Sequence, residues 1–234
     1  MKFKILTLFP EIFPGPINHS VTGKALKKKK FQLETINIRD FSINKAKTVD
    51  DTPFGGGAGM IMKADILQSA LTFAKKGFKK NCKIFSLSPS GKKITQSFIK
   101  NLVTSKEIIL ICGRYEGIDQ RFIDYNDIEE ISVGDYILSG GELASFILID
   151  ACVRLIPEVL GNSESLRSES FHDYLLEYSQ YTKPSIWKKL KVPEVLLSGN
   201  HKKISDWRLK NSLEKTKKIR PELYNLFVKE KKRK

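Results

Sequence analysis

Two turns bracketed by glycine hold most of the side chains in this sequence that could take part in chemistry. The first, Gly113–Gly117, encloses an arginine, a tyrosine and a glutamate, and the second spans Gly134–Gly141. Each turn directly follows a short apolar run, Ile108–Cys112 or Ile128–Val133, of the kind that forms a buried strand. Backbone approaches a ligand most closely where a residue has no Cβ, and α/β proteins bind ligands at strand ends. The pattern therefore predicts one pocket built mostly from main chain.

Spacing alone does not assign a chemical role to three further charged side chains. Arg154 ends a long apolar segment, Glu169 lies near the end of a serine-rich stretch, and Asp173 follows that stretch. A guanidinium can stabilise a developing negative charge, and a carboxylate can remove a proton. From spacing alone, the favoured interpretation is that Arg154 caps the C-terminus of its helix and that Glu169 is simply solvated.

The common nucleotide-binding motifs are missing from the sequence. The glycine-rich loop within Asn44–Met60 is not followed by the Gly-Lys-Ser/Thr of a nucleotide-triphosphate loop, and a plain flexible loop explains it equally well. A dinucleotide fold or a Rossmann-type methyltransferase would carry its glycine fingerprint after the first strand, where this chain has F-P-E-I-F-P-G. The three histidines are too scattered to ligate a metal. The three cysteines are expected to be buried reduced thiols, which fits a reducing cytoplasm.

The elements that must position these residues alternate between strands and helices. Strands are predicted at 2–8, 31–38, 83–87, 108–112 and 128–133, and helices at 21–30, 64–76, 95–103, 120–125 and 142–155. Segment 11–18 carries two prolines, so any helix there should be short or broken. The turn Ser88–Gly91 is expected to end the third strand. Such alternation predicts an α/β fold with a parallel sheet covered on both faces.

Composition adds a basic C-terminal region to this picture. The 234 residues are 41% hydrophobic, enough for one core and a smaller second domain, and no apolar run is long enough to cross a membrane. The N-terminus lacks a signal-peptide cleavage site. The net charge of +15 favours nucleic acid as a partner, although lysines used for solubility are the alternative.

The serine-rich stretch 161–170 is predicted to be a flexible linker, because it has no hydrophobic periodicity. Beyond it, the chain is helical in pattern, basic and aromatic. Ile204, Trp207 and Leu213 could form a buried stripe on one helix while its lysines face solvent. This region is either an RNA-docking face, with basic side chains on phosphates, or a small domain with a solvated basic surface.

Taken together, the motifs resemble those of bacterial tRNA (guanine-N1)-methyltransferases of the SPOUT superfamily, in order and over nearly the whole chain. They comprise D-D-T-P-F-G-G-G-A-G-M, L-S-P-S-G, G-R-Y-E-G-I-D, S-V-G-D-Y-I-L-S-G-G-E-L, R-L-I-P-E-V-L-G and V-P-E-V-L-L-S-G-N-H. The resemblance implies a SPOUT-type domain over 1–160 with a C-terminal trefoil knot, and a helical tRNA-binding domain over 171–234. It also implies a homodimer with composite active sites, S-adenosylmethionine as methyl donor, and N1-methylguanosine at position 37 of tRNA as product.

The resemblance also assigns roles to individual residues. Cofactor binding maps onto the residues Ser88, Pro89, Gly91, Gly113, Tyr115, Glu116, Val133, Gly134, Asp135, Tyr136, Ile137, Leu138, Gly140, Gly141 and Glu177. Arg154 and Glu169 would be catalytic: the arginine would stabilise the guanine O6, and the glutamate would remove the N1 proton. Asp173 is the alternative base. The resemblance also suggests Mg²⁺ near Glu116 and Glu169, although the residues themselves assign no metal ligands.

This chain departs from the family pattern at three positions. Glu169 and Glu177 replace aspartates, which keeps the carboxylate and adds a methylene, and Ser86 replaces an aromatic residue expected to pack on the adenosine. Two of these departures, Ser86 and Glu169, favour one alternative, a non-catalytic RNA-binding or ribosome-assembly protein on the same scaffold. A second alternative, a related knotted methyltransferase that acts on ribosomal RNA, is disfavoured by the C-terminal motifs.

Overall fold

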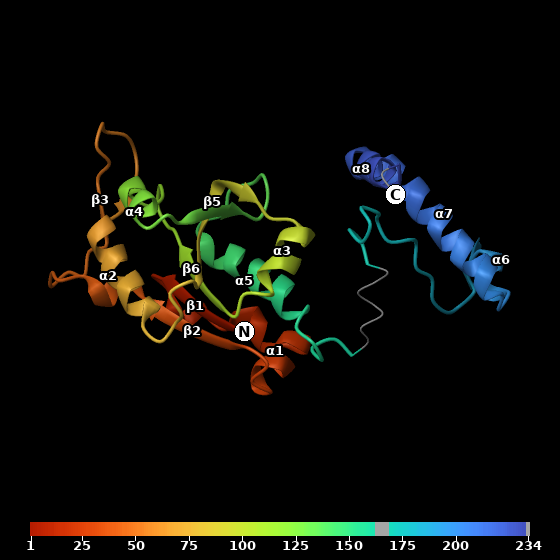
Figure 1. Cartoon of the computed structure of the whole chain (residues 1–234), viewed down its shortest axis with the longest axis horizontal. Helices are drawn as coiled ribbons and strands as arrows, with labels where there is room; N and C mark the ends of the chain where they lie inside the picture. The colour runs from red at the N-terminus through yellow and green to blue at the C-terminus, as the bar shows by residue number, and fades with distance from the viewer. Residues whose placement is uncertain (162–168, 233–234) are drawn as a thin grey trace. The chain divides into compact units, whose positions relative to one another are not determined.

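The computed structural model describes residues 1–161 and 169–232. The chain divides into two compact units, Met1–Gly161 and Asn162–Lys234. The first unit is built on a five-stranded sheet in the order β2-β1-β6-β5-β7, and every neighbouring pair is parallel (Figure 1). Its strands are β1 (Lys2–Thr7), β2 (Gln32–Asn37), β5 (Lys83–Lys93), β6 (Glu107–Cys112) and β7 (Glu129–Ser132). The predicted α/β fold with a parallel central sheet is therefore confirmed.

Helices cover both faces of this sheet (Figure 1). One face packs against α1 (Ser20–Lys27), α3 (Gln96–Leu102) and α5 (Gly141–Val153), and the other against α2 (Ala64–Lys75) and α4 (Gln120–Tyr125). The central strand β6 shows why the sequence forms this layer: Ile108, Leu110 and Cys112 enter one core, while Ile109 and Ile111 enter the other. A strand that is buried on both faces is a continuous apolar run rather than an alternating one.

The remaining elements of the first unit are short. Two 3₁₀ turns, η1 (Pro10–Ile12) and η2 (Gly15–Asn18), occupy the segment predicted to hold a short or broken helix. A third, η3 (Ile38–Phe41), follows β2. The hairpin of β3 (Asp50–Asp51) and β4 (Ile61–Met62) frames the glycine-rich loop.

The predicted end of the third strand at Leu87 was wrong. Strand β5 pairs with β7 as far as Leu87, opens into an irregular excursion, and resumes pairing at Lys92, so that both Leu87 and Lys92 are partners of Ile131. The Ser-Pro-Ser-Gly sequence is therefore a bulge inside a strand. Gly91 allows the chain to return, because a Cβ at this position would lie 2.4 Å from the Ile131 nitrogen.

The second unit contains a small hairpin followed by helices. Its elements are β8 (Ile186–Trp187), β9 (Leu190–Lys191), α6 (Glu194–Leu197), α7 (His201–Ile219) and α8 (Pro221–Lys231). Helix α7 begins at a side-chain cap, since the Asn200 amide oxygen accepts a hydrogen bond from the Lys203 nitrogen at 3.1 Å. Most of the predicted linker, residues 162–168, lies outside the described residues.

Helix α7 buries different residues from those predicted. Ile204, Trp207 and Leu213 are only partly buried, whereas Ser212 and Thr216 are buried. The reason is that polar side chains of α7 hold the extended segment before the hairpin. The Thr216 hydroxyl accepts a hydrogen bond from the Leu176 nitrogen at 2.8 Å, and Asn211 Oδ1 accepts one from the Ser179 nitrogen at 2.8 Å. Hydrophobic periodicity gives no signal for such packing.

The cysteines are free, as expected, although only two of the three are fully buried. Cys112 and Cys152 are buried, and Cys82 is half-buried. Burial raises the pKa of the Cys152 thiol to about 12. No helix in the parts of the chain that the structure describes has the length and apolarity needed to cross a membrane.

Candidate functional site

A cleft of about 420 Å³ lies at the carboxyl ends of the three strands β5, β6 and β7. Its walls are the bulge of β5, the turn 113–118 that follows β6, and the loop 133–141 that leads from β7 into α5. Neighbouring parallel strands bring their carboxyl ends to the same edge of a sheet, which is why turns distant in sequence meet here. The volume falls within the range of small-molecule sites.

Most of the predicted cofactor residues line this cleft. Twelve of the fifteen do so: Ser88, Pro89, Gly113, Tyr115, Glu116, Val133, Gly134, Tyr136, Ile137, Leu138, Gly140 and Gly141. The other three do not. Gly91 lies against the backbone of β7, Asp135 forms an exposed ion pair of 2.7 Å with Lys93, and Glu177 belongs to the second unit.

Glycines let the two turns approach each other closely. The Gly141 nitrogen donates a hydrogen bond to the Gly113 carbonyl at 3.0 Å, and a Cβ on Gly141 would lie only 2.7 Å from Cys112 Cα. Tyr115, at the tip of the first turn, adopts a left-handed backbone with φ 58°. The cleft therefore offers main-chain N–H and C=O groups where side chains would otherwise fill it.

One end of the glycine-rich loop is hydrogen-bonded to the first turn of this cleft. The Glu116 nitrogen donates to the Met60 carbonyl, and the Met62 nitrogen donates to the Gly117 carbonyl, both at 2.9 Å. Gly59 faces the Glu116 side chain so closely that a Cβ would lie 2.4 Å from its Cγ. The tip of the loop, Gly55–Gly57, has open space around it. The loop is thus hydrogen-bonded to the first turn at one end and surrounded by open space at its tip, which the glycine run alone did not indicate.

A buried ionic cluster beneath the two turns was not predicted. Glu142, only 2% exposed, accepts a hydrogen bond from the Thr7 hydroxyl at 2.7 Å. Its other carboxylate oxygen lies 2.9 Å from Arg114 Nε, although the angle is not that of a hydrogen bond, so both atoms are buried without a hydrogen-bond partner among the described residues. We regard the contact as an ion pair because the two charges meet away from solvent.

Arg114 extends this cluster across both turns. Its Nη1 donates to the Ser139 carbonyl at 3.0 Å, and its guanidinium lies 4.5 Å from the centre of the Phe9 ring. The cluster thus joins the ends of β1 and β6 to the start of α5. Glu142 is a charged residue in an otherwise apolar helical segment, and this feature of the sequence could have revealed the buried cluster.

The one cysteine at this edge of the sheet has no place in covalent chemistry. Cys112 ends β6 directly before the first turn and is fully buried. Its burial, and secondarily the nearby Glu142 carboxylate, raise the pKa of its thiol well above the usual range. A buried thiol with a raised pKa is poorly suited to act as a nucleophile.

Arg154 and Glu169 belong to different units. Arg154 is the C-cap residue of α5, the position expected if it caps that helix. Glu169 is half-buried in the second unit, where its carbonyl accepts a hydrogen bond from the His172 nitrogen at 3.2 Å. The Ser170 hydroxyl accepts one from the Glu177 nitrogen at 3.0 Å, which joins the segment after Glu169 to Glu177.

Asp173, the alternative base, lies in an unusual turn. Phe171, Asp173 and Tyr174 all have left-handed backbones, with φ of 74°, 49° and 61°. Such conformations are costly for aromatic residues and occur most often at functional sites. The Asp173 side chain is 75% exposed and lies 3.3 Å from His172 Nδ1.

Comparisons with known proteins agree on one family. The family model described as tRNA (Guanine-1)-methyltransferase TrmD matches residues 1–226. The tRNA (guanine-N(1)-)-methyltransferase of Neorickettsia sennetsu is 52% identical over 223 residues, which cover 95% of this chain and 98% of that protein. The proteins of the same name from Pelagibacter ubique and Wolbachia pipientis wMel are 52% and 54% identical, over 97% and 94% of this chain and 98% and 93% of theirs.

Proposed function

The chain belongs to the tRNA (guanine-1)-methyltransferase family, and from this premise we propose that it methylates guanosine 37 of tRNA at N1 with S-adenosylmethionine as donor. It is an enzyme that forms N1-methylguanosine in tRNA. The donor, the position in tRNA and the cytoplasm as the place of reaction are the parts that we propose.

One observation carries the choice of cofactor: five glycines, Gly113, Gly117, Gly134, Gly140 and Gly141, line the cleft at the ends of β5, β6 and β7. Backbone can come close to a ligand at such positions. S-adenosylmethionine combines an adenine, which backbone groups can hydrogen-bond, with a ribose and an amino-acid tail. The close approach of Gly113 and Gly141 holds the two turns together around the space that such a ligand would occupy. Ser86, buried at 2% exposure, takes the place of a larger ring in the wall and would leave room beside the adenosine.

The bound cofactor supplies an activated methyl group on its sulfonium. The chain must then hold guanine N1 in line with that group, and such positioning can lower a barrier by about 7–11 kcal/mol. We assign removal of the N1 proton to the Glu169 carboxylate and stabilisation of the negative charge that develops on O6 to the Arg154 guanidinium. Glu169 lies within the polar, serine-rich stretch 161–170, so binding of RNA would bring its carboxylate to the base.

Two protomers would complete each active site in this proposal. Leu143 and Ile147, one turn apart on α5, are 54% and 45% exposed although most of that helix is buried. An apolar stripe beside the cleft supports a partner subunit at this surface. Arg154 from one protomer and Glu169 from the other would then act on the same base. The trefoil knot and the assignment of tRNA binding to residues 171–234 remain predictions.

Mg²⁺ would need ligands from more than one part of the assembly. No group of three or more histidine, cysteine, aspartate or glutamate side chains that could hold a metal occurs within 1–161 and 169–232. Because Mg²⁺ keeps several waters and often uses one or two carboxylates plus substrate oxygens, Glu116 and Glu169 would suffice as protein ligands. A requirement for the ion is therefore a proposal that chelation and readdition of Mg²⁺ would test.

The decisive experiment is to incubate the protein with labelled S-adenosylmethionine and unmodified tRNA, and then to map the methylated base. Label at N1 of guanosine 37 supports the proposal. No label in tRNA would favour one of the other two possibilities.

The base is assigned by comparing Glu169→Gln with Asp173→Asn in single-turnover assays. We expect Glu169→Gln to lower the rate at least ~100-fold, the lower end of general-base contributions, with little change in tRNA affinity. Asp173→Asn, the matched control, should retain most of the rate. Near-normal turnover by Glu169→Gln would rule out our assignment.

A further inference from the structure

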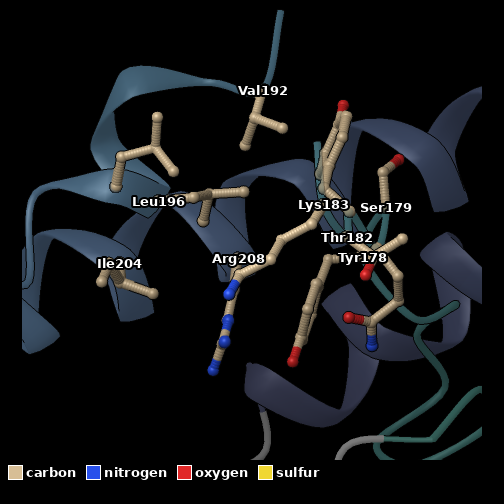
Figure 2. Close-up of a pocket in the computed structure, with 11 residues that line it drawn as sticks. Tyr178, Ser179, Thr182, Lys183, Val192, Leu196, Ile204 and Arg208 are labelled. Carbon is tan, nitrogen blue, oxygen red and sulfur yellow. The ribbon is translucent and has the colours of Figure 1, made fainter. Parts of the chain in front are cut away.

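The second unit contains a pocket of about 330 Å³ that the proposed methyl transfer does not use (Figure 2). The extended segment 178–183 forms one wall, and side chains of α6 and α7 form the other. Val192, Leu196 and Ile204 provide an aliphatic surface, all three partly buried. A pocket of this size lies at the small end of the range for organic ligands, so it would hold one ring system rather than a peptide.

Planar side chains border this aliphatic surface. The Arg208 guanidinium lies 4.8 Å from the centre of the Tyr178 ring, and the two side chains run alongside each other in Figure 2. Tyr181, also in the wall, lies 6.2 Å from Trp207 between ring centres. Aromatic rings and guanidinium planes are the groups on which unstacked nucleobases stack in protein–RNA complexes.

Polar groups beside these planes could read the edge of a base. Ser179, Gln180 and Thr182 all line the pocket and belong to a segment without regular structure. The Gln180 amide nitrogen donates to Glu177 Oε1 at 2.6 Å, which orients the side chain. The pocket therefore combines an apolar floor, stacking planes and hydrogen-bonding groups, a combination suited to a heterocycle.

The positive charge of the second unit favours a heterocycle that is part of a polyanion. Residues 162–234 contain 18 lysines and arginines against nine aspartates and glutamates, so this third of the chain carries +9 of the net +15. The nearby hairpin presents Trp187, 59% exposed, with Lys188 Nζ 5.0 Å from the centre of its ring. A neutral ligand or an apolar peptide would gain nothing from this charge, whereas a nucleotide in an RNA chain would.

We propose that this pocket binds one unstacked nucleobase of the tRNA substrate, a subsite separate from the one that holds the target guanine. The proposal rests on the proposed function, because it takes tRNA as the ligand. The Arg208 and Tyr178 planes contribute stacking, Ile204 and Leu196 contribute apolar contact, and the surrounding lysines contact the flanking phosphates. Occupation of the subsite would fix the register of the anticodon loop before the reacting base is engaged.

The test measures equilibrium binding of full-length protein to a set of tRNAs in which each anticodon-loop nucleotide outside position 37 is made abasic in turn. We expect one abasic position to weaken binding to the wild type roughly five-fold or more, the contribution of one stacked base. Ile204→Trp fills the pocket, and Arg208→Lys keeps the charge but removes the plane. Both should weaken binding of intact tRNA by a similar factor and lose sensitivity to that one abasic position.

Lys210→Gln is the matched control. Lys210 lies on the same helix, outside the pocket, where it pairs with Glu214 at 3.9 Å. This variant should keep the full abasic effect. If both pocket variants respond to every abasic tRNA as the wild type does, the subsite does not exist; Arg208→Lys decides alone if Ile204→Trp does not fold. Because binding is measured without methyl transfer, failure of the proposed activity would show separately, as a wild type that binds tRNA but transfers no label.

Discussion

Gly140 has an extended backbone, with φ 172°, that any residue could adopt, so its constraint comes from the space around it. A Cβ there would lie 2.3 Å from Arg114 Nε. We expect Gly140→Val to displace the guanidinium, spread the two turns and abolish cofactor binding in calorimetry while the protein remains folded. Gly161→Ala is the control, because Gly161 has open space around it. Unchanged cofactor affinity in Gly140→Val would contradict the proposed pocket.

The Arg114–Glu142 pair makes a second prediction at the residue scale. Removing one partner of a buried ion pair leaves the other charge uncompensated, so Glu142→Ala should lower the free energy of unfolding by about 3 kcal/mol. The double variant Arg114→Met/Glu142→Leu should recover much of that loss, because apolar groups replace both charges. Urea unfolding of the three proteins provides the comparison. A single variant as stable as the wild type would mean that the pair does not stabilise the fold.

At the scale of elements, the bulge in β5 connects the stability of the sheet to the shape of the cleft. A Cβ on Gly91 would meet backbone of β7, 2.4 Å from the Ile131 nitrogen and 2.7 Å from the Glu130 oxygen, and backbone cannot rotate away. Gly91→Ala should therefore disrupt the pairing beyond the bulge, destabilise the protein by about 1–3 kcal/mol, and weaken cofactor binding. Gly161→Ala, at a glycine with open space around it, should change neither property. Equal melting temperatures for Gly91→Ala and the wild type would show that the close approach of Gly91 to the backbone of β7 is not needed for stability.

The elements of the first unit were predictable because their apolar patterns are strong. Continuous runs such as Ile108–Cys112 belong to strands that are buried on both faces. The return of β5 to β7 was not predictable, since Ser-Pro-Ser-Gly has the composition of a turn whether or not the strand continues. The order of strands also depends on crossovers that periodicity does not encode.

The two glycine turns predicted a pocket, whereas the buried ionic cluster beneath it was not predicted. Twelve of the residues that the resemblance assigned to the cofactor line the cleft. The contact of Thr7 with Glu142 joins residues 135 positions apart, and nothing in the type of either residue predicts the other as its partner. The resemblance also assigned Asp135, whose side chain pairs with exposed Lys93; the direction of a side chain depends on backbone angles within the loop, which the sequence pattern does not give.

At the scale of the whole molecule, the proposed dimer makes the enzyme sensitive to the surface of α5. Ile147→Glu places a charge in the exposed apolar stripe and should yield monomers in sedimentation experiments, with loss of methyl transfer because each site would lack its second half. Ile43→Glu is the control, since Ile43 is fully exposed elsewhere on the first unit. If the wild type is already monomeric and active, composite sites are excluded.

A cleft lined by glycine-rich turns also limits how the enzyme could escape a competitive inhibitor. Peptide amides are present whatever the side chain, so a drug that bonds to the backbone of 113–117 and 133–141 loses no partner to most point mutations. Resistance would have to come from proline, which deletes an N–H, or from bulk added at a glycine, and both changes would deform the surface that the natural ligand needs.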